Sequence, residues 1–104
     1  MTTKQGSPGH ESPGNVDHTA QDSYWRDNFS KRPYVLPDRE YGWYQPAYRY
    51  GWEARAHLRN QKWDEVERDL DAGWMMRRGD STLEWNEAKP AARDAWDRLD
   101  DTDF

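Results

Sequence analysis

Glu53 and His57 have a spacing that can serve catalysis, because residues four apart share one face of a helix. In zinc metalloproteases, two histidines at this spacing bind the metal and a glutamate between them acts as the general base. This sequence has neither the second histidine nor that glutamate, and His10 and His18 lie in a polar stretch with few neighbouring ligands. We therefore predict no metal or cofactor site, and we interpret Glu53 and His57 either as a surface ion pair or with His57 as a histidine packed at the edge of the helix.

Carboxylates are abundant in the second half of the chain, and two of them across a cleft could hydrolyse a glycosidic bond. They are Asp64, Glu65, Glu67, Asp69, Asp71, Glu84, Glu87, Asp94 and Asp97. Opposite charges four residues apart, which are typical of a solvated helix face, occur in the pairs Asp64–Arg68, Arg93–Asp97 and Asp94–Arg98. The chain also lacks cysteine and any Ser-His-Asp pattern, so we predict that the protein is not an enzyme.

The stretch from Tyr48 to Arg55 alternates aromatic and basic side chains, as proteins that bind single-stranded nucleic acid do. Tyr48 and Trp52 belong to the repeated stripe described below. The remaining members, Arg49, Tyr50 and Arg55, are therefore expected to point outward. The net charge of -5 disfavours a general phosphate-backbone binder, which leaves nucleic-acid binding as an alternative rather than the leading hypothesis.

The composition predicts one small domain with an aromatic core. The chain has 104 residues, no isoleucine, seven tryptophans and six tyrosines. Each buried aromatic ring removes a large area from water, so a few can hold a small domain together. There is no cysteine, no apolar leader, and no run near the roughly 20 apolar residues that a membrane span needs. We expect a cytoplasmic protein with no membrane partner.

A 22-residue unit occurs three times in residues 41–104, and its tryptophans are eleven residues apart. Offsets 0, 3, 7 and 11 of the unit fall on one narrow stripe of a helix. The stripe residues are Tyr41, Tyr44, Tyr48, Trp52, Trp63, Val66, Leu70, Trp74, Trp85, Ala88, Ala92 and Trp96. Periodic aromatics at helical spacing are usually buried, so we predict that these residues form the structural core. Offset 10 is always small (Gly51, Gly73 and Ala95), which would let another helix approach closely.

The breaks in this pattern predict three helices, at about residues 45–59, 64–77 and 86–99. Pro46 and Pro90 are tolerated only near a helix start, and Arg78 to Ser81 reads as a loop. Short connections favour antiparallel packing of neighbouring helices. The expected fold is therefore all-α, with a small three-helix domain over residues 41–100 and a frayed tail at 101–104.

The N-terminal 40 residues divide into two parts. Residues 1–22 carry little to bury and are predicted to form a disordered tail. Residues 23–40 include a short helical turn up to Phe29 and a proline-containing extended stretch from Lys31 to Pro37. This segment is rich in apolar groups, so it either wraps onto the helical domain or docks a partner. We favour wrapping, because small domains need all the burial available.

Five stretches of this chain resemble a group of uncharacterised small bacterial proteins over about residues 23–100. The stretches are YWRDNF (24–29), RPYV (32–35), YQPAYRYGWEAR (44–55), WDEVERDL (63–70) and AARDAWDR (91–98). Members of the group lack an assigned activity, so the resemblance implies no catalytic residues, and some accompany general-stress and envelope-stress genes. The group usually has proline at offset 5 of the second copy, where this sequence has Arg68.

Together these observations predict a non-enzymatic, stress-associated helical interaction protein that acts by self-association or through a protein partner. Tyr, Trp and Arg are the residues that interfaces favour. The candidate partner-binding residues are Tyr24, Trp25, Phe29, Tyr34, Arg49, Tyr50 and Arg55. The alternative is weak binding of single-stranded nucleic acid through Arg49, Tyr50 and Arg55 on the first helix.

Overall fold

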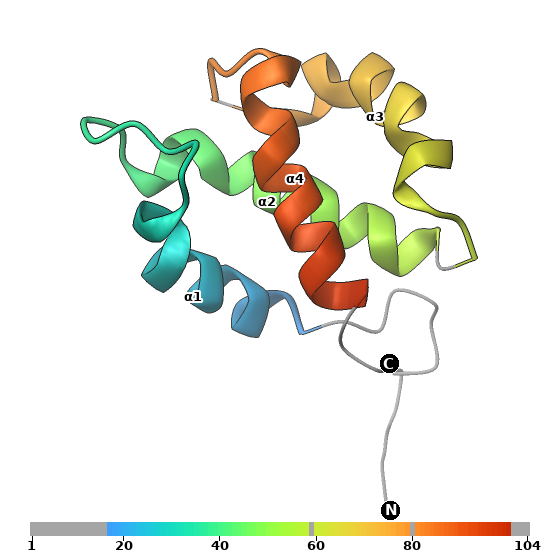
Figure 1. Cartoon of the computed structure of the whole chain (residues 1–104), viewed down its shortest axis with the longest axis horizontal. Helices are drawn as coiled ribbons and strands as arrows, with labels where there is room; N and C mark the ends of the chain where they lie inside the picture. Colours follow the sequence, from blue (N-terminus) through green and yellow to red (C-terminus); the bar gives the residue numbers. More distant parts are fainter. Residues whose placement is uncertain (1–16, 59, 80, 101–104) are drawn as a thin grey trace, which may run out of the picture.

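The computed structural model describes residues 17–58, 60–79 and 81–100, which form an all-α fold (Figure 1). Its elements are α1 (His18–Asn28), the short 3-10 helix η2 (Phe29–Lys31), α2 (Tyr41–His57), α3 (Trp63–Arg77) and α4 (Trp85–Asp100). The predicted fold class is confirmed, and α1 adds a fourth α-helix to the three that the repeat predicts. The predictions for residues 1–16 and 101–104 lie outside the described residues.

α2 is the central helix of the fold. α4 crosses it and makes the most extensive contact between any two elements, while α1 also packs against α2 (Figure 1). We predicted that neighbouring helices of the repeat pack roughly antiparallel, but α2 and α3 make little direct contact, and the main partner of α2 is α4, which is not its neighbour in sequence. α3 packs mainly on α4, and the Tyr50 side chain of α2 fills the space toward Gly73 of α3.

The predicted aromatic stripe forms the core. Eleven of its twelve residues are buried, and Tyr41 is half-buried against the same cluster. Trp63 and Trp85 stack with their ring centroids 6.5 Å apart, and Trp96 meets Trp63 edge-on at 5.7 Å. Such packing of large rings replaces the aliphatic core that the composition lacks.

The helix boundaries differ from the predicted ones at the N-terminal ends. α2 begins at Tyr41 rather than near residue 45, so Pro46 lies in its second turn, and Pro90 has the same place in α4. Pro46 removes only the N–H that would have bonded the carbonyl of Gly42. Proline therefore marks a helix start less closely here than we predicted.

α1 begins inside the region that was predicted to be a disordered tail. The Asp17 side chain caps its first turn by accepting a hydrogen bond from the Ala20 N–H at 3.0 Å. Gln21 is buried, and its side-chain oxygen accepts a hydrogen bond from Arg98 of α4 at 2.9 Å. The prediction for residues 17–22 was therefore wrong, because these residues pack through polar contacts to a distant helix.

The aromatic segment wraps onto the helical domain, as predicted. Trp25 is only 4% exposed and stacks on Tyr48 of α2, with centroids 4.4 Å apart and an interplanar angle of 8°. Phe29 and Tyr34 pack partly buried against the same core. The segment thus covers part of the α2 surface that α4 does not cover.

Candidate functional site

A polar network closes the wrapped segment onto α2 and α4. Arg32 donates to Asp94 through Nε at 2.7 Å and Nη2 at 3.2 Å, and the Tyr34 hydroxyl donates to the same carboxylate at 2.5 Å. The Tyr34 and Tyr48 oxygens are 2.8 Å apart. Because Tyr34 gives its only proton to Asp94, Tyr48 must donate to Tyr34. Every member is engaged within the chain, so the network serves to join three elements.

Two tyrosines and the arginine of this network are held in their ordinary protonation states. Burial, and then the hydrogen bond to Asp94, raises the pKa of Tyr34 far above its usual range. Burial likewise raises the pKa of Tyr48, and the hydrogen bond to Asp94 raises the pKa of Arg32. Neutral tyrosines and a permanently charged arginine suit a structural joint rather than proton transfer.

Tyr50 was predicted to point outward, and this prediction was wrong. Its side chain is 9% exposed and lies in the core cluster, with its ring 5.6 Å from Trp74. Its hydroxyl donates to the Leu70 carbonyl of α3 at 2.9 Å. Tyr50 fills the space between α2 and α3, so its faces are not free to stack on a base.

The other sequence-predicted partner-binding residues do not form one surface. Trp25, Phe29 and Tyr34 pack inward, as described above. Tyr24 is partly exposed, and the Arg98 guanidinium lies 3.7 Å from its ring centroid. Arg55 lies over the Trp96 ring of α4, 5.8 Å from its centroid. Two of the candidate set, Arg49 and Tyr50, border one cavity.

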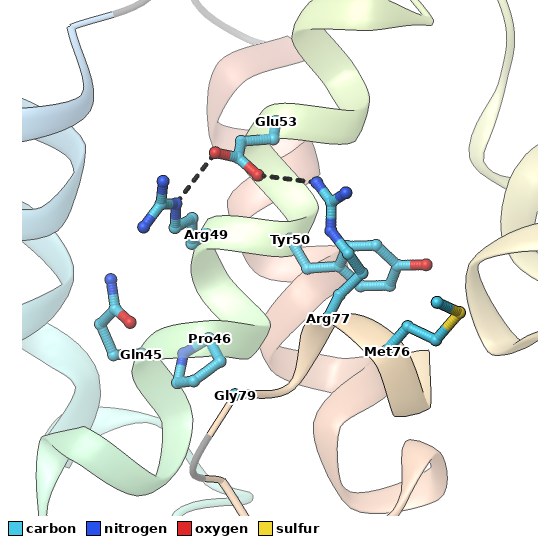
Figure 2. A pocket seen from close by; sticks show the side chains of 8 residues that line it. All are labelled: Gln45, Pro46, Arg49, Tyr50, Glu53, Met76, Arg77 and Gly79. Atoms are coloured by element: carbon cyan, nitrogen blue, oxygen red, sulfur yellow. Dashed lines mark hydrogen bonds and ion pairs between the residues drawn. The ribbon is translucent and has the colours of Figure 1, made fainter. Parts of the chain in front are cut away.

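Arg49 belongs to a small ion cluster that links α2 to α3. The Glu53 carboxylate accepts from Arg49 Nε at 2.9 Å and from Arg77 Nη2 at 3.3 Å (Figure 2). The Arg77 guanidinium also lies 5.9 Å from the centroid of the Tyr50 ring. Glu53 is thus an ion-pair residue, and the described residues hold no group of three or more metal-ligating side chains.

Beside this cluster an open apolar groove runs between α2 and α3, with a volume of about 410 Å³. We call it the α2–α3 groove. It is lined by Tyr50, Glu53, Ala54, His57, Leu58, Leu70, Gly73, Met76 and Arg77. Its size falls within the range of ligand pockets in proteins, and its lining is mainly apolar. The groove exists because Tyr50 spaces α2 from α3 instead of letting their backbones meet.

Met76 is the most exposed large apolar residue of the described chain. It is 89% exposed at the edge of the α2–α3 groove, and its neighbour Met75 is 63% exposed. Methionine is flexible and polarizable, which suits adaptable binding surfaces. Sequence reasoning missed both residues. The available signal was a pair of adjacent methionines that lie off the tryptophan stripe at the end of a helix.

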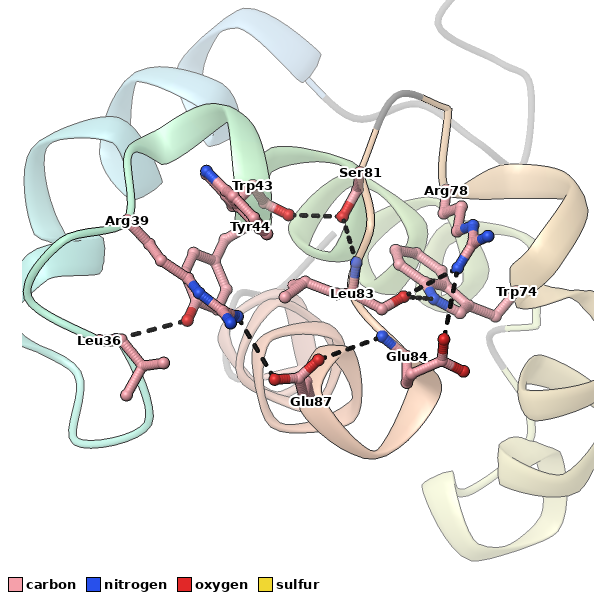
Figure 3. A network of polar contacts seen from close by, with 10 residues as sticks. All are labelled: Leu36, Arg39, Trp43, Tyr44, Trp74, Arg78, Ser81, Leu83, Glu84 and Glu87. Atoms are coloured by element: carbon pink, nitrogen blue, oxygen red, sulfur yellow. Dashed lines mark hydrogen bonds and ion pairs between the residues drawn. The ribbon is translucent and has the colours of Figure 1, made fainter.

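The connection between α3 and α4 fixes the end of α3 that carries Met76. The buried Ser81 hydroxyl donates to the Trp43 carbonyl at 2.7 Å, and the Trp74 indole N–H donates to the Leu83 carbonyl at 2.9 Å (Figure 3). Gly79 adopts a φ of 59° just after the helix, a conformation that glycine reaches without strain. One wall of the groove is therefore held in place by hydrogen bonds.

Comparisons of the chain with protein-family models, curated proteins and solved structures found no match. No helix in the described part of the chain is long and apolar enough to cross a membrane.

Proposed function

We propose that the protein is a non-enzymatic interaction module that binds a protein partner through the α2–α3 groove. The observation that carries this proposal is the 89% exposure of Met76 at the edge of an apolar groove. An exposed apolar side chain beside an apolar hollow is typical of a surface that is covered on binding. Arg77 in the groove lining and Arg49 in the adjoining cavity supply directional polar contacts, as arginine does at many interfaces.

The size of the groove favours a partner side chain or helix face rather than a broad flat surface. Burying one large apolar side chain contributes about 1.5–3 kcal/mol, which is too little for stable association alone. The surrounding surface of α3 must therefore add to the interface. A helix laid along the groove would meet Leu58, Leu70 and Met76 together.

The non-enzymatic part of the proposal is supported by the use of the titratable groups. The groups with the largest pKa changes are tyrosines that burial keeps neutral, chiefly Tyr34, Tyr41 and Tyr48. Asp94 and Glu53 are each bound by side chains from other parts of the fold. The contacts of these groups join elements of the structure, and this structural role accounts for them without a catalytic one.

The resemblance of residues 23–100 to small bacterial proteins supports a role in the stress response, and the lack of cysteine is compatible with the reducing cytoplasm. We therefore propose a stress-associated role and a cytoplasmic location. Cell fractionation tests the location, and a measurement of protein abundance after envelope stress tests the role. An unchanged abundance would remove the stress role without affecting the groove.

Site-specific photocrosslinking in living cells tests the binding function. We place p-benzoylphenylalanine at position 76, beside the groove, and at position 71 as a control. Asp71 is exposed and lies about 140° around α3 from Met76, on the side away from the groove. We expect a discrete adduct with a protein from position 76 and little from position 71. Equal or absent adducts at both positions would refute binding at the groove.

A further inference from the structure

We infer that the α2–α3 groove takes a second copy of this chain, with the two α3 helices side by side and antiparallel. This inference rests on the proposed function and names its partner. The groove and the exposed Met76 that would fill it lie on the same side of the molecule. A surface that carries both a projection and a matching hollow is complementary to itself, which is the requirement for a twofold dimer.

A narrow exposed stripe on α3 borders the groove. It consists of Glu65, Asp69, Ala72 and Met76, at offsets 0, 4, 7 and 11, which fall on one face of a helix. The small Ala72 near its middle lets a second helix approach closely. Met76 belongs both to this stripe and to the groove lining, so a helix that covers the stripe also covers the groove.

A twofold axis near Gly73 gives this pairing a definite register. In an antiparallel pair, residues at equal distances before and after the centre face each other. Met76 of one copy then faces Leu70 of the other, inside the groove, and Arg77 faces Asp69. Because the arrangement is symmetric, each contact occurs twice.

The charges along α3 are complementary in this register. Asp69 is exposed, and Arg77 keeps 57% of its side-chain surface exposed although one nitrogen binds Glu53. A guanidinium has five N–H donors, so Arg77 can bind Glu53 and a second carboxylate together. A parallel arrangement would instead place Asp69 beside Asp69 and Arg77 beside Arg77, where like charges repel.

Sedimentation equilibrium of the purified full chain tests the dimer. We expect a monomer–dimer equilibrium, and Met76→Ser should raise its dissociation constant by about 100-fold or more, because an apolar contact is lost twice. Asp69→Arg should abolish the dimer by opposing Arg77. The matched control is Asp71→Arg, which makes the same charge change on the other side of α3 and should leave the dimer intact.

Mixing charge variants tests the register. Asp69→Arg and Arg77→Glu should each be monomeric alone, but an equimolar mixture should form a heterodimer, in which both pairs become attractive. Thermal unfolding of each variant verifies that it is folded. The natural chain has no cysteine, so Ala72→Cys provides a second measurement. It should form a disulfide-linked dimer under mild oxidation much faster than Asp71→Cys, whether or not Arg77→Glu folds.

A chain that stays monomeric at about 1 mM would overturn the self-association, because even weak dimers form at that concentration. A dimer that withstands Asp69→Arg and Met76→Ser would overturn the interface. Either result can be told apart from failure of the proposed function. A crosslink from position 76 to a different protein would leave the groove as a binding site and reject only the second copy.

Discussion

Gly51 of α2 lies directly against the backbone of Ala92 in α4. A β-carbon built on Gly51 would be 2.0 Å from the Ala92 carbonyl oxygen and 2.8 Å from its carbonyl carbon. The two helices cross at this point with no side chain between them, which allows α4 to make its extensive contact with α2. The small residue at offset 10 of the repeat therefore has a specific use, because it sets the distance between the two most closely packed helices.

Gly51→Ala should destabilise the protein by about 3 kcal/mol or more, because the added methyl meets backbone that cannot move without separating α2 from α4. Urea unfolding followed by tryptophan fluorescence measures the loss. Gly42→Ala is the matched control on the same helix, since a β-carbon there meets nothing within 4 Å. It should stabilise the protein by about 0.5–1 kcal/mol through helix propensity. Equal effects of the two substitutions would contradict the close crossing.

Stability should fall steeply in alkaline solution. Burial raises the pKa of Tyr34 and Tyr48 in the folded state, while an unfolded tyrosine ionises near pH 10. The contribution of these buried, neutral tyrosines to the free energy of unfolding is fully present below pH 10. It is lost as the pH rises above 10, because the unfolded chain releases protons there that the folded chain retains. Each such tyrosine lowers the free energy of unfolding by at most about 1.4 kcal/mol per pH unit. Urea titrations between about pH 9 and 11 measure this slope, and Tyr48→Phe should reduce it.

Asp94→Asn should loosen the wrapped segment. The carboxylate accepts charge-assisted bonds from Arg32 and a bond from Tyr34, so we expect a loss of about 1.5–3 kcal/mol. Asp97→Asn is the control, because Asp97 pairs with Arg93 on the exposed surface of the same helix. That surface pair should contribute less than about 1 kcal/mol. Comparable losses in the two variants, measured by chemical denaturation, would show that the network does not hold the segment.

Trp74→Ala should cost about 3–5 kcal/mol, because it empties a core position and removes the donor to the Leu83 carbonyl. Trp43→Ala changes the same residue type at a site that is 38% exposed, compared with 1% for Trp74. We expect about 1–2 kcal/mol there, including the lost contact with the Arg39 guanidinium over its ring. Differential scanning calorimetry compares the two variants. If the Trp74 variant kept the melting temperature of the parent, the stripe would not be the core.

The sequence predicts the core because a stripe of a helix is a local property. Offsets 0, 3, 7 and 11 define one face whatever the tertiary structure, and the structure buries that face in all three repeats. The burial of Trp25 and Tyr34 was also predictable, because so small a chain has few other apolar groups to use.

Tyr50 shows where the same reasoning fails. At 100° per residue it lies opposite the stripe of α2, so a helix with one buried face would expose it. α2 is the central helix, however, and its opposite side is covered by α3 and by Trp74 and Trp85, whose rings lie near the Tyr50 ring. The three copies of the repeat have the same stripe, so the repeat does not indicate which of the three helices will be covered on both sides. That depends on the tertiary arrangement.

The α2–α3 groove was beyond prediction for a related reason. It depends on the position of Tyr50 between the helices and on the hydrogen bonds of Ser81 that fix the end of α3. The Arg98–Gln21 contact that buries part of α1 joins residues 77 positions apart, and no local pattern identifies such a pair.

Asp94 also determines when the protein can fold. It lies 62 positions after Arg32, so α1 and the segment after it leave the ribosome long before their partners on α4 exist. Helical bundles whose contacts are mostly local fold in microseconds to milliseconds, and distant contacts slow that step. Trp25 can stack on Tyr48 as soon as α2 has been made, whereas Arg32 and Tyr34 have no Asp94 to bind until α4 is complete, so the wrapped segment closes onto the domain in two stages.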